Sequence, residues 1–492
     1  MKQLSRLRLV ATAVAVAALT AFAPGVAHAD APANDDFDAA TEITALPATT
    51  TVDTTGATKA PDDPGICNYQ SYSTVWVRYT ASADGLVKLT SQSTRYTFYA
   101  VFTGTRGALT PVPGGCTTPG EREKTFSVKA GTTYHLAVAE HYSGYTGPVS
   151  LTMTPVRAAV NDDRAAATPV TVPSRVEGDL TRATPEPGEA PPSCDAAATQ
   201  SLWYSYRATR TQWVNVSAYY NAISVHRAGD LSEVDCFASG GNSNGAVFAT
   251  TAGETYLIRV ARAADDADPF WMDVQAAAPL KPYTAVSYYE PSVFDDLPFE
   301  LGSGDPHGRV LTSGVIDFGD GTSKNFVAYE QIRHRYARDG VYTVTVSGST
   351  NDGRTGTGTS TVTIDTHDVS VAPLTVPSSV RAGQTKPIKV SVANARQTEN
   401  VRVTLYRVNE TGGYDEEIGQ AVQRVAASPT GKVDFPFAYT YTAKDAALGK
   451  VTFRAVAALE NWNLREAKPD DNEARATTAS VRAAATATAL TD

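Results

Sequence analysis

The stretch Cys67-Asn-Tyr-Gln-Ser-Tyr-Ser-Thr-Val-Trp-Val-Arg-Tyr79 decides the fold, because the chain returns to its landmarks further on. Its cysteine and its tryptophan both reappear 127 positions later, as Cys194 and Trp203. Repetition of several landmarks in the same order and at a nearly fixed spacing indicates a tandem duplication. The other matched segments are Asn34-Asp35-Asp36 with Asn161-Asp162-Asp163, and Ala130–Tyr134 with Ala252–Tyr256.

Short strands separated by turn residues fill both copies. The turn Ala83-Asp84-Gly85 precedes the apolar run 86–89, and Ala130-Gly131 separates the runs 125–128 and 134–138. No helical period lies between these runs. Strands at this spacing predict an all-β sandwich in each copy.

The chain opens with the pattern of a secretory signal peptide over residues 1–29. Basic residues at 2–8 precede an apolar stretch at 9–22, and Ala27-His28-Ala29 forms a small-residue cleavage site. A retained membrane anchor is the alternative, although the apolar stretch of about 14 residues is shorter than the ~20 needed to cross a bilayer. We therefore expect a secreted protein with no membrane span once the signal is removed.

The composition is acidic, with 52 Asp and Glu against 42 Lys and Arg and a formal net charge of −10. Binding to phosphate backbones requires concentrated Lys and Arg, and no basic cluster is present. We therefore expect no nucleic-acid partner.

Four cysteines remain after the signal segment, two in each copy. An even number of cysteines in an exported protein indicates disulfides. Of the three possible pairings, the duplication favours Cys67 with Cys116 and Cys194 with Cys236. A zinc site is the alternative, and it lacks the Cys-x-x-Cys or nearby Cys/His pairs that zinc sites use.

Three segments of the first copy carry a family resemblance: Asn34-Asp35-Asp36-Phe37, Val-Asp-Thr-Thr-Gly-Ala-Thr at 52–58, and Ser-Thr-Val-Trp-Val-Arg-Tyr at 73–79. Over residues 30–156 the chain resembles a bacterial pre-peptidase C-terminal (PPC) domain. The resemblance implies a jelly-roll-like β-sandwich of a kind that accompanies secreted enzymes and can bind matrix polymers. Residues 157–276 form a second, divergent PPC-like copy.

After the linker-like residues 276–279, the sequence Asp317-Phe318-Gly319-Asp320-Gly321 is followed by His334, Tyr336 and Tyr342. This spacing resembles a PKD domain, which implies an immunoglobulin-like sandwich over 280–366. Ile316 stands where the family usually has a tryptophan. Because the glycines suit a turn with positive φ and Asp320 can bond nearby amides, we interpret the motif as structural rather than ligand-binding.

Alternating strands recur at 388–392, 401–406 and 435–441. The segment 367–482 resembles a bacterial cell-adhesion-related (CARDB-like) domain, again an immunoglobulin-like sandwich. The small and polar residues 483–492 are expected to form a disordered tail. The predicted fold is therefore all-β, with four tandem sandwiches, two jelly-roll-like and two immunoglobulin-like.

No catalytic constellation is recognisable. Residues 241–245 fit the pattern Gly-x-Ser-x-Gly, but a nucleophile elbow requires a strand followed by a helix, and a β run follows here. The chain has no His-Glu-x-x-His zinc motif. Adjacent carboxylates at 62–63, 265–266 and 416–417 do not indicate two acids facing each other across a glycosidase cleft. We predict a protein that is not an enzyme and that needs no cofactor other than a possible structural calcium ion.

Two binding hypotheses remain. Tyr142 and Tyr145 flank a glycine turn and could present an aromatic surface to a sugar or an extended polymer, with strand-edge packing as the alternative. Asp35 and Asp36, and their copies Asp162 and Asp163, offer hard oxygen donors for calcium, with a domain-boundary turn as the alternative.

Together these observations predict a secreted, non-catalytic protein that binds or spaces an extracellular polysaccharide or a matrix or surface protein. An accessory subunit of a secreted hydrolase system is the second hypothesis. A cryptic hydrolase is the third, and fold alone cannot decide between them.

Overall fold

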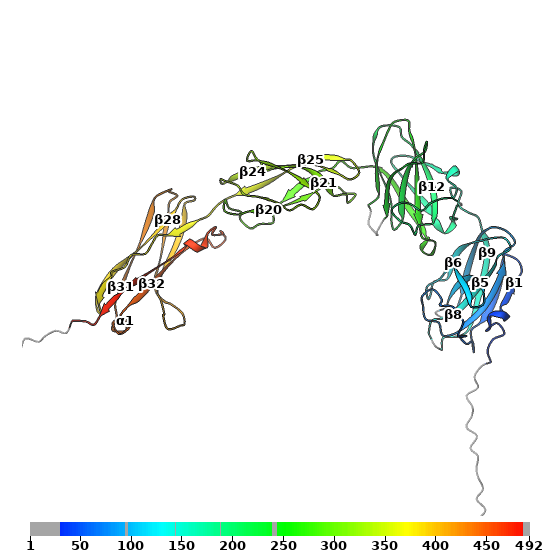
Figure 1. Ribbon diagram of the computed structural model, residues 1–492, viewed down its shortest axis with the longest axis horizontal. Helices are drawn as coiled ribbons and strands as arrows, with labels where there is room; N and C mark the ends of the chain where they lie inside the picture. Colours follow the sequence, from blue (N-terminus) through cyan, green and yellow to red (C-terminus); the bar gives the residue numbers. More distant parts are fainter. Residues whose placement is uncertain (1–29, 94–96, 143, 187, 239–243, 486–492) are drawn as a thin grey trace, which may run out of the picture. The chain divides into compact units, whose positions relative to one another are not determined.

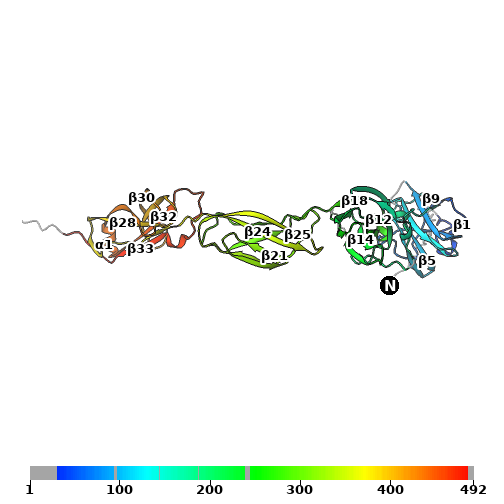
Figure 2. The same ribbon diagram turned by 90° about the horizontal axis from the view of Figure 1, so that it is seen from above.

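The computed structural model describes residues 30–93, 97–142, 144–186, 188–238 and 244–485. The signal-like segment 1–29, most of the Gly-x-Ser-x-Gly segment and most of the tail therefore lie outside the described residues. The chain is all-β, with four tandem β-sandwiches, as predicted (Figures 1 and 2). It divides into two compact units, Met1–Ala276 and Ala277–Asp492, each of which holds two sandwiches.

The first sandwich packs a five-stranded sheet on a four-stranded sheet. Its pairs are antiparallel except that β1 runs parallel to β3. Alternating residues such as Val87, Leu89 and Phe126 point inward and are fully buried, which explains the period of two in the sequence. In sheet order the strands are β1 (Thr41–Ile43), β3 (Thr74–Thr80), β8 (Thr133–Glu140), β5 (Thr97–Thr105) and β6 (Ala108–Cys116), then β2 (Ala48–Asp53), β9 (Pro148–Val156), β4 (Gly85–Gln92) and β7 (Glu123–Val128).

The second sandwich repeats this strand order in both sheets, as the duplication predicts. Its strands are β10 (Thr168–Val170), β12 (Gln200–Arg207), β17 (Thr255–Arg262), β14 (Ala222–Arg227) and β15 (Glu233–Ala238), then β11 (Ser174–Asp179), β18 (Pro269–Ala276), β13 (Gln212–Ala218) and β16 (Ala246–Thr250).

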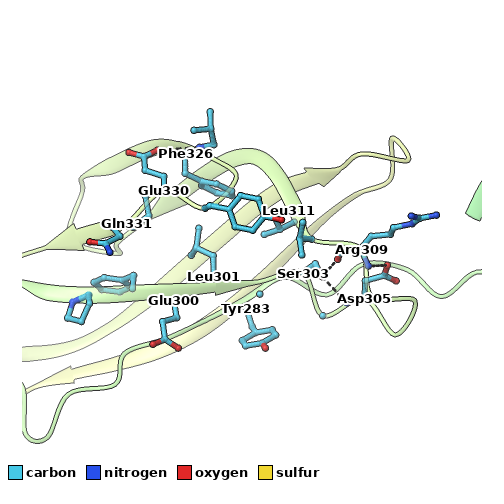
Figure 3. Close-up of a pocket in the computed structure, with 18 of the residues that line it drawn as sticks. Tyr283, Glu300, Leu301, Ser303, Asp305, Arg309, Leu311, Phe326, Glu330 and Gln331 are labelled. Atoms are coloured by element: carbon cyan, nitrogen blue, oxygen red, sulfur yellow. Dashed lines mark hydrogen bonds between the residues drawn. The ribbon is translucent and has the colours of Figure 1, made fainter. Parts of the chain in front are cut away.

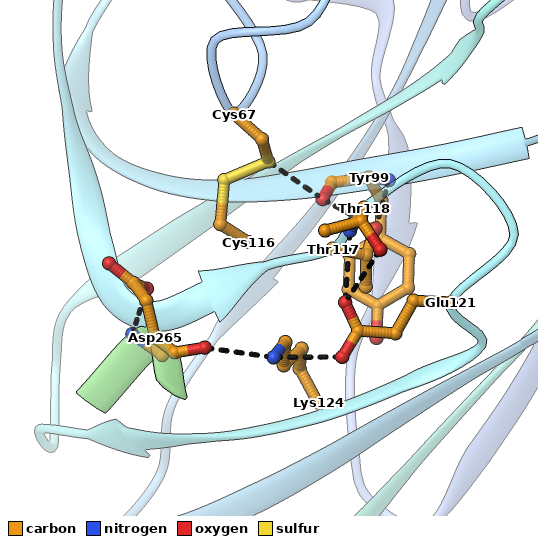
Figure 4. Close-up of a disulfide and its surroundings, with 9 residues drawn as sticks. Cys67, Tyr99, Cys116, Thr117, Thr118, Glu121, Lys124 and Asp265 are labelled. Atoms are coloured by element: carbon orange, nitrogen blue, oxygen red, sulfur yellow. Dashed lines mark hydrogen bonds and ion pairs between the residues drawn. A yellow bond between two sulfur atoms is a disulfide. The ribbon is translucent and has the colours of Figure 1, made fainter. Parts of the chain in front are cut away.

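Both predicted disulfides are present, Cys67–Cys116 and Cys194–Cys236, which confirms the pairing. Figure 4 shows the first of them. They join residues 49 and 42 positions apart. Loops of this length favour the folded state by about 4 kcal/mol each in the chain-entropy description. Each bond fixes the loop before the tryptophan strand to an edge strand of the same sheet.

The third sandwich has a three-stranded sheet facing a four-stranded one. Ile316, at the position where the resemblance led us to expect tryptophan, is fully buried in its core. The strands are β19 (Tyr283–Ala285), β20 (Leu297–Gly302) and β23 (Ile332–His334), facing β22 (Ser323–Val327), β21 (Leu311–Asp317), β24 (Gly340–Thr350) and β25 (Thr355–Ile364).

The predicted PKD motif forms a network of internal contacts. Asp320 accepts hydrogen bonds from Thr322 and contacts His334 Nε2 at 2.7 Å, while the His334 ring stacks on Phe318 at 4.0 Å. Tyr336 donates to the Phe318 carbonyl, and Tyr342 stacks on Tyr336 at 4.1 Å. Asp317 accepts from the amide of Gly319, whose φ is +78°, and Gly321 has φ +91°. These contacts support the structural interpretation of the motif.

The fourth sandwich contains the only α-helix among the described residues, α1 (Ala443–Leu448). Thr442 and Asp445 form a capping box at its start, and Gly449 ends it in the left-handed region. No helix in the described part of the chain is long and apolar enough to cross a bilayer. The strands are β26 (Val369–Val371), β28 (Thr385–Asn394) and β31 (Lys432–Thr440), then β30 (Glu416–Val425), β29 (Glu399–Arg407), β32 (Val451–Leu459) and β33 (Glu473–Thr478), and the parallel pair β27 (Ser379–Arg381) and β34 (Ser480–Arg482).

Candidate ligand-binding surfaces

The duplicated Asn-Asp-Asp motif fastens the start of each sandwich to its tryptophan strand. Asn34 Nδ2 donates to the Trp76 carbonyl at 3.1 Å, and the Trp76 amide donates to the Asn34 carbonyl at 2.9 Å. Asn161 and Trp203 repeat both bonds at 3.0 and 2.9 Å. Buried polar groups are costly unless paired, and this arrangement pairs them reciprocally. The first residue of the motif therefore has a structural role in both copies.

The second residue of the motif closes a loop. The Asp35 carboxylate accepts from the amide and the hydroxyl of Thr58, at 2.6 and 2.7 Å, and Asp162 accepts the same two bonds from Thr184. Burial raises the pKa of Asp162, and the Thr184 bonds oppose that rise only in part. Both carboxylates are thus engaged by protein donors.

The third residue of the first motif, Asp36, is one of three carboxylates that surround an arginine. The Arg106 guanidinium lies 2.7 Å from Asp36, 3.0 Å from Asp38 and 2.7 Å from Asp62. The Asp38 amide and then Arg106 lower the pKa of Asp36. In the second copy, Asp163 makes no side-chain capping bond. Within the described residues, no three or more His, Cys, Asp or Glu side chains form a group suited to a metal, and the calcium site stays a prediction.

The predicted aromatic hairpin is solvent-exposed, and other rings join it. We define the aromatic rim as Tyr69, His141, Tyr142 and Tyr145. The His141 ring meets Tyr69 at 5.9 Å and Tyr142 at 4.5 Å, and Tyr142 lies 6.0 Å from Tyr145. The three pairs are tilted by 88°, 65° and 60°. Tyr142 and Tyr145 therefore lie close together, but the rim is not a flat platform, and its role as a ligand site stays a prediction.

The second sandwich has a pocket of about 510 Å³ that sequence reasoning missed. Strand β11 pairs with β18 so that Glu177 lies opposite Trp271 and Asp179 opposite Pro269. Leu202 and Phe270 contribute apolar lining, and Asn161, Glu177, Asp179 and Arg182 contribute polar groups. A concave site that combines apolar side chains with a few polar groups is typical of small-ligand sites.

Trp271 is the main exposed ring of this pocket, with 53% of its surface exposed. The Arg175 guanidinium lies 5.1 Å from the centre of the indole and 3.6 Å from Asp273. Such a cation–π contact favours one ring orientation by about 0.5–1 kcal/mol at an exposed site. Trp271 lines the pocket whereas Arg175 does not, so the stacked arginine orients the indole without filling the pocket.

Internal bonds hold two of the polar groups in place. Asp179 accepts from the amide and the hydroxyl of Thr181, at 3.1 and 2.6 Å. Arg182 donates to the carbonyls of Arg157 and Ala158. The pocket is therefore built from side chains whose positions are largely set before any ligand arrives.

A comparison of the two copies contains the signal that the sequence reasoning overlooked. In the first copy, the facing pair equivalent to Glu177 and Trp271 is Thr51 and Ser150. Two small hydroxyl residues have thus become a carboxylate and an indole in the divergent copy. This difference places the exposed indole of Trp271 at the pocket of the second copy.

Two protein families match parts of the chain. A PKD domain family matches residues 290–365, which confirms that resemblance. A family described as galactose binding domain-like matches residues 160–274, the second sandwich. The PPC and CARDB-like resemblances stay predictions. A comparison with curated proteins gave no match.

Several solved structures are similar to parts of this chain at low sequence identity. They include fibronectin(III)-like modules of Clostridium thermocellum CbhA, with 14% identity over 41% of this chain and 92% of that one and a TM-score of 0.22. Three N-terminal domains of the bacteriophage RB49 Hoc protein match with 13% identity over 58% of this chain and 98% of that one, with a TM-score of 0.27. A tetra-tandem repeat from the extending region of a large adhesion protein matches with 14% identity over 81% of this chain and 98% of that one, with a TM-score of 0.20.

Proposed function

We propose that this chain is a non-catalytic extracellular protein that binds carbohydrate through the Trp271 pocket. The observation that carries the proposal is the half-exposed indole of Trp271, oriented by Arg175, at a pocket inside the segment that matches the galactose binding domain-like family. An indole face offers apolar area to the C–H groups of a sugar ring. The carboxylates of Glu177 and Asp179 supply acceptors for sugar hydroxyls.

Two features support an extracellular location. Both disulfides would be kept reduced in most cytosolic compartments, and they are formed here. The pattern at 1–29 is that of a secretory signal. The remaining sandwiches act as spacers or as further contact surfaces.

The test is binding of the oxidised full chain to immobilised polysaccharides, followed by titration with oligosaccharides from the polymer that retains it. We expect the Trp271→Ala variant to bind at least about tenfold more weakly, because tryptophans that a bound partner covers often dominate a contact. Trp462→Ala, which removes an exposed indole from the fourth sandwich, is the matched control and should bind normally. Equal binding by both variants would rule out the pocket.

The aromatic rim is a second candidate surface on the first sandwich, because its four rings gather at one exposed edge. A Tyr142→Ala/Tyr145→Ala variant tests it in the same assay. If that variant alone loses binding, the rim and not the Trp271 pocket holds the polymer.

A further inference from the structure

A groove of about 670 Å³ opens along one side of the third sandwich (Figure 3). Strand β20 pairs with β23 over Leu297–Phe299 and with β19 over Glu300–Gly302, so that from Glu300 onward its β23 side has no strand partner among the described residues. Figure 3 shows Leu301 and Leu311 on the side of β20 that faces Phe326, with Tyr283 and Glu300 on the other side of this strand, and all five residues line the groove. No contact of the PKD motif described above uses this space.

Tyr283 forms a fixed aromatic surface in this groove. It pairs with Gly302 across β19 and β20, and a Cβ at residue 302 would lie 2.4 Å from two atoms of its ring. Only glycine therefore lets the ring lie this close to the backbone. The side chain is still 52% exposed, so one side of the ring packs on the strand while the rest faces solvent.

Tyr329 contributes a second ring from the connector between β22 and β23. It is 91% exposed, and its φ of +62° is in the left-handed region. A tyrosine in this region costs roughly 1–2 kcal/mol relative to the usual conformation. Its exposed ring recovers almost nothing by packing, so folding gives no reason for tyrosine at this position. Backbone strain of this kind is often found at functional sites.

Polar side chains also line the groove. Glu300 and Gln331 both line the groove, where they offer carboxylate and amide groups to a ligand. Glu330 is engaged by Lys324 at 2.9 Å, and Asp305 is buried in an ion pair with Arg354. The groove thus combines aromatic rings with neutral and acidic hydrogen-bonding groups.

The end of β22 in the groove is poorly suited to an added peptide strand. The amide of Val327 donates to the Glu330 carboxylate, and the Val327 carbonyl accepts from the Glu330 amide. The Glu300 carbonyl already accepts from the Thr284 hydroxyl. A peptide that binds by strand addition needs such groups to be unpaired. The groove therefore favours a ligand recognised by its ring faces and hydroxyls.

We propose that this groove binds an oligosaccharide between Tyr283 and Tyr329, independently of the Trp271 pocket. The proposal rests on the proposed function in that both sites take a carbohydrate. It adds a second site on a different module, with residues of its own. Tyr329 holds an exposed ring on a backbone with positive φ, so its position suits contact with a ligand more than it suits stability of the fold.

The test titrates the full chain with β-1,4-linked hexasaccharides of galactose, glucose and N-acetylglucosamine, measured by calorimetry. The wild-type chain should bind two molecules, and Trp271→Ala should bind one. Adding Tyr283→Ala/Tyr329→Ala to Trp271→Ala should remove the remaining site, with a loss of at least about tenfold in affinity. Tyr414→Ala, which removes a fully exposed tyrosine of the fourth sandwich, is the matched control.

A Tyr329→Gly variant separates binding from folding. Glycine adopts positive φ without strain, so the unfolding midpoint of the third sandwich should stay the same or rise while groove binding is lost. A purely structural tyrosine would instead lower the midpoint when replaced. That result would overturn the proposal.

The outcomes distinguish the two sites. If Trp271→Ala alone abolishes all oligosaccharide binding, the groove proposal fails and the proposed function stands. If only the tyrosine variants lose binding, the groove stands and the Trp271 pocket fails. If an alternating Thr-Val hexapeptide binds the groove and no hexasaccharide does, the carbohydrate proposal is overturned in favour of a peptide site.

Discussion

At the residue scale, one substitution changes the environment of the repeated tryptophan. Trp76 faces Ala137 across β3 and β8, and its outer side packs in an apolar cluster. Trp203 instead faces Arg259, which is only 3% exposed, lies 5.6 Å over the indole and pairs with Glu189 at 2.8 Å. The second copy therefore keeps the fold while it replaces an apolar layer by a buried ion pair.

Glu189→Gln should destabilise the second sandwich by about 3 kcal/mol or more, because it leaves the Arg259 charge buried without its ionic partner. The free energy of unfolding in urea measures the effect. Glu42→Gln removes the partner of Arg78 in an exposed pair of the first sandwich and should change little. A similar loss of stability in both variants would contradict the expectation that breaking the buried ion pair costs more than breaking the exposed one.

Asp320 predicts how the third sandwich responds to acid. Burial would raise its pKa, but bonds from Thr322 and His334 outweigh burial and lower the pKa overall. A lowered pKa stabilises the fold above the unfolded value, near 4, and this contribution disappears as the pH falls through the folded value. The thermal unfolding midpoint of the third sandwich should therefore decrease as the pH is lowered below about 4. Asp320→Asn should flatten that dependence, and an unchanged slope would show that other groups cause it.

At the scale of elements, the strands and the disulfides follow from local patterns, whereas the pocket does not. Alternation around Trp76 predicts β3, and the duplicated cysteines predict both bonds. The pocket depends on the register that places Glu177 opposite Trp271, residues far apart in the chain. Each looks like an ordinary outward strand residue in the sequence. A period of two shows on which face of the sheet a residue lies, but it does not show which residue lies opposite on the next strand.

Reduction should affect only the first two sandwiches, because all four cysteines lie there. Opening each bond should lower the stability of its own sandwich by about 4 kcal/mol. Calorimetry with and without tris(carboxyethyl)phosphine should show earlier melting of these two modules and unchanged melting of the segment 277–485. A shift in the later modules would show that the two units stabilise each other.

At the scale of the whole molecule, the two proposed carbohydrate sites lie in different units of the chain. Trp271 belongs to the first unit, and Tyr283 and Tyr329 belong to the second. If one polymer can engage both, the second contact becomes intramolecular and binding to polymer exceeds binding to either short fragment. The sequence predicts separate modules, but the sites on them arise from loops and registers that only the folded chain brings together.

The parallel pairing of β27 with β34 has a mechanical consequence. β27 lies near the start of the fourth sandwich and β34 is its last strand, and they pair over Ser379–Arg381 and Ser480–Arg482. Tension applied at the two ends of this sandwich would pull the strands in opposite directions along their length. Their hydrogen bonds would then be sheared together, whereas an antiparallel hairpin would unzip one bond at a time. A chain held to a polymer at one end and dragged at the other would resist extension at this sandwich.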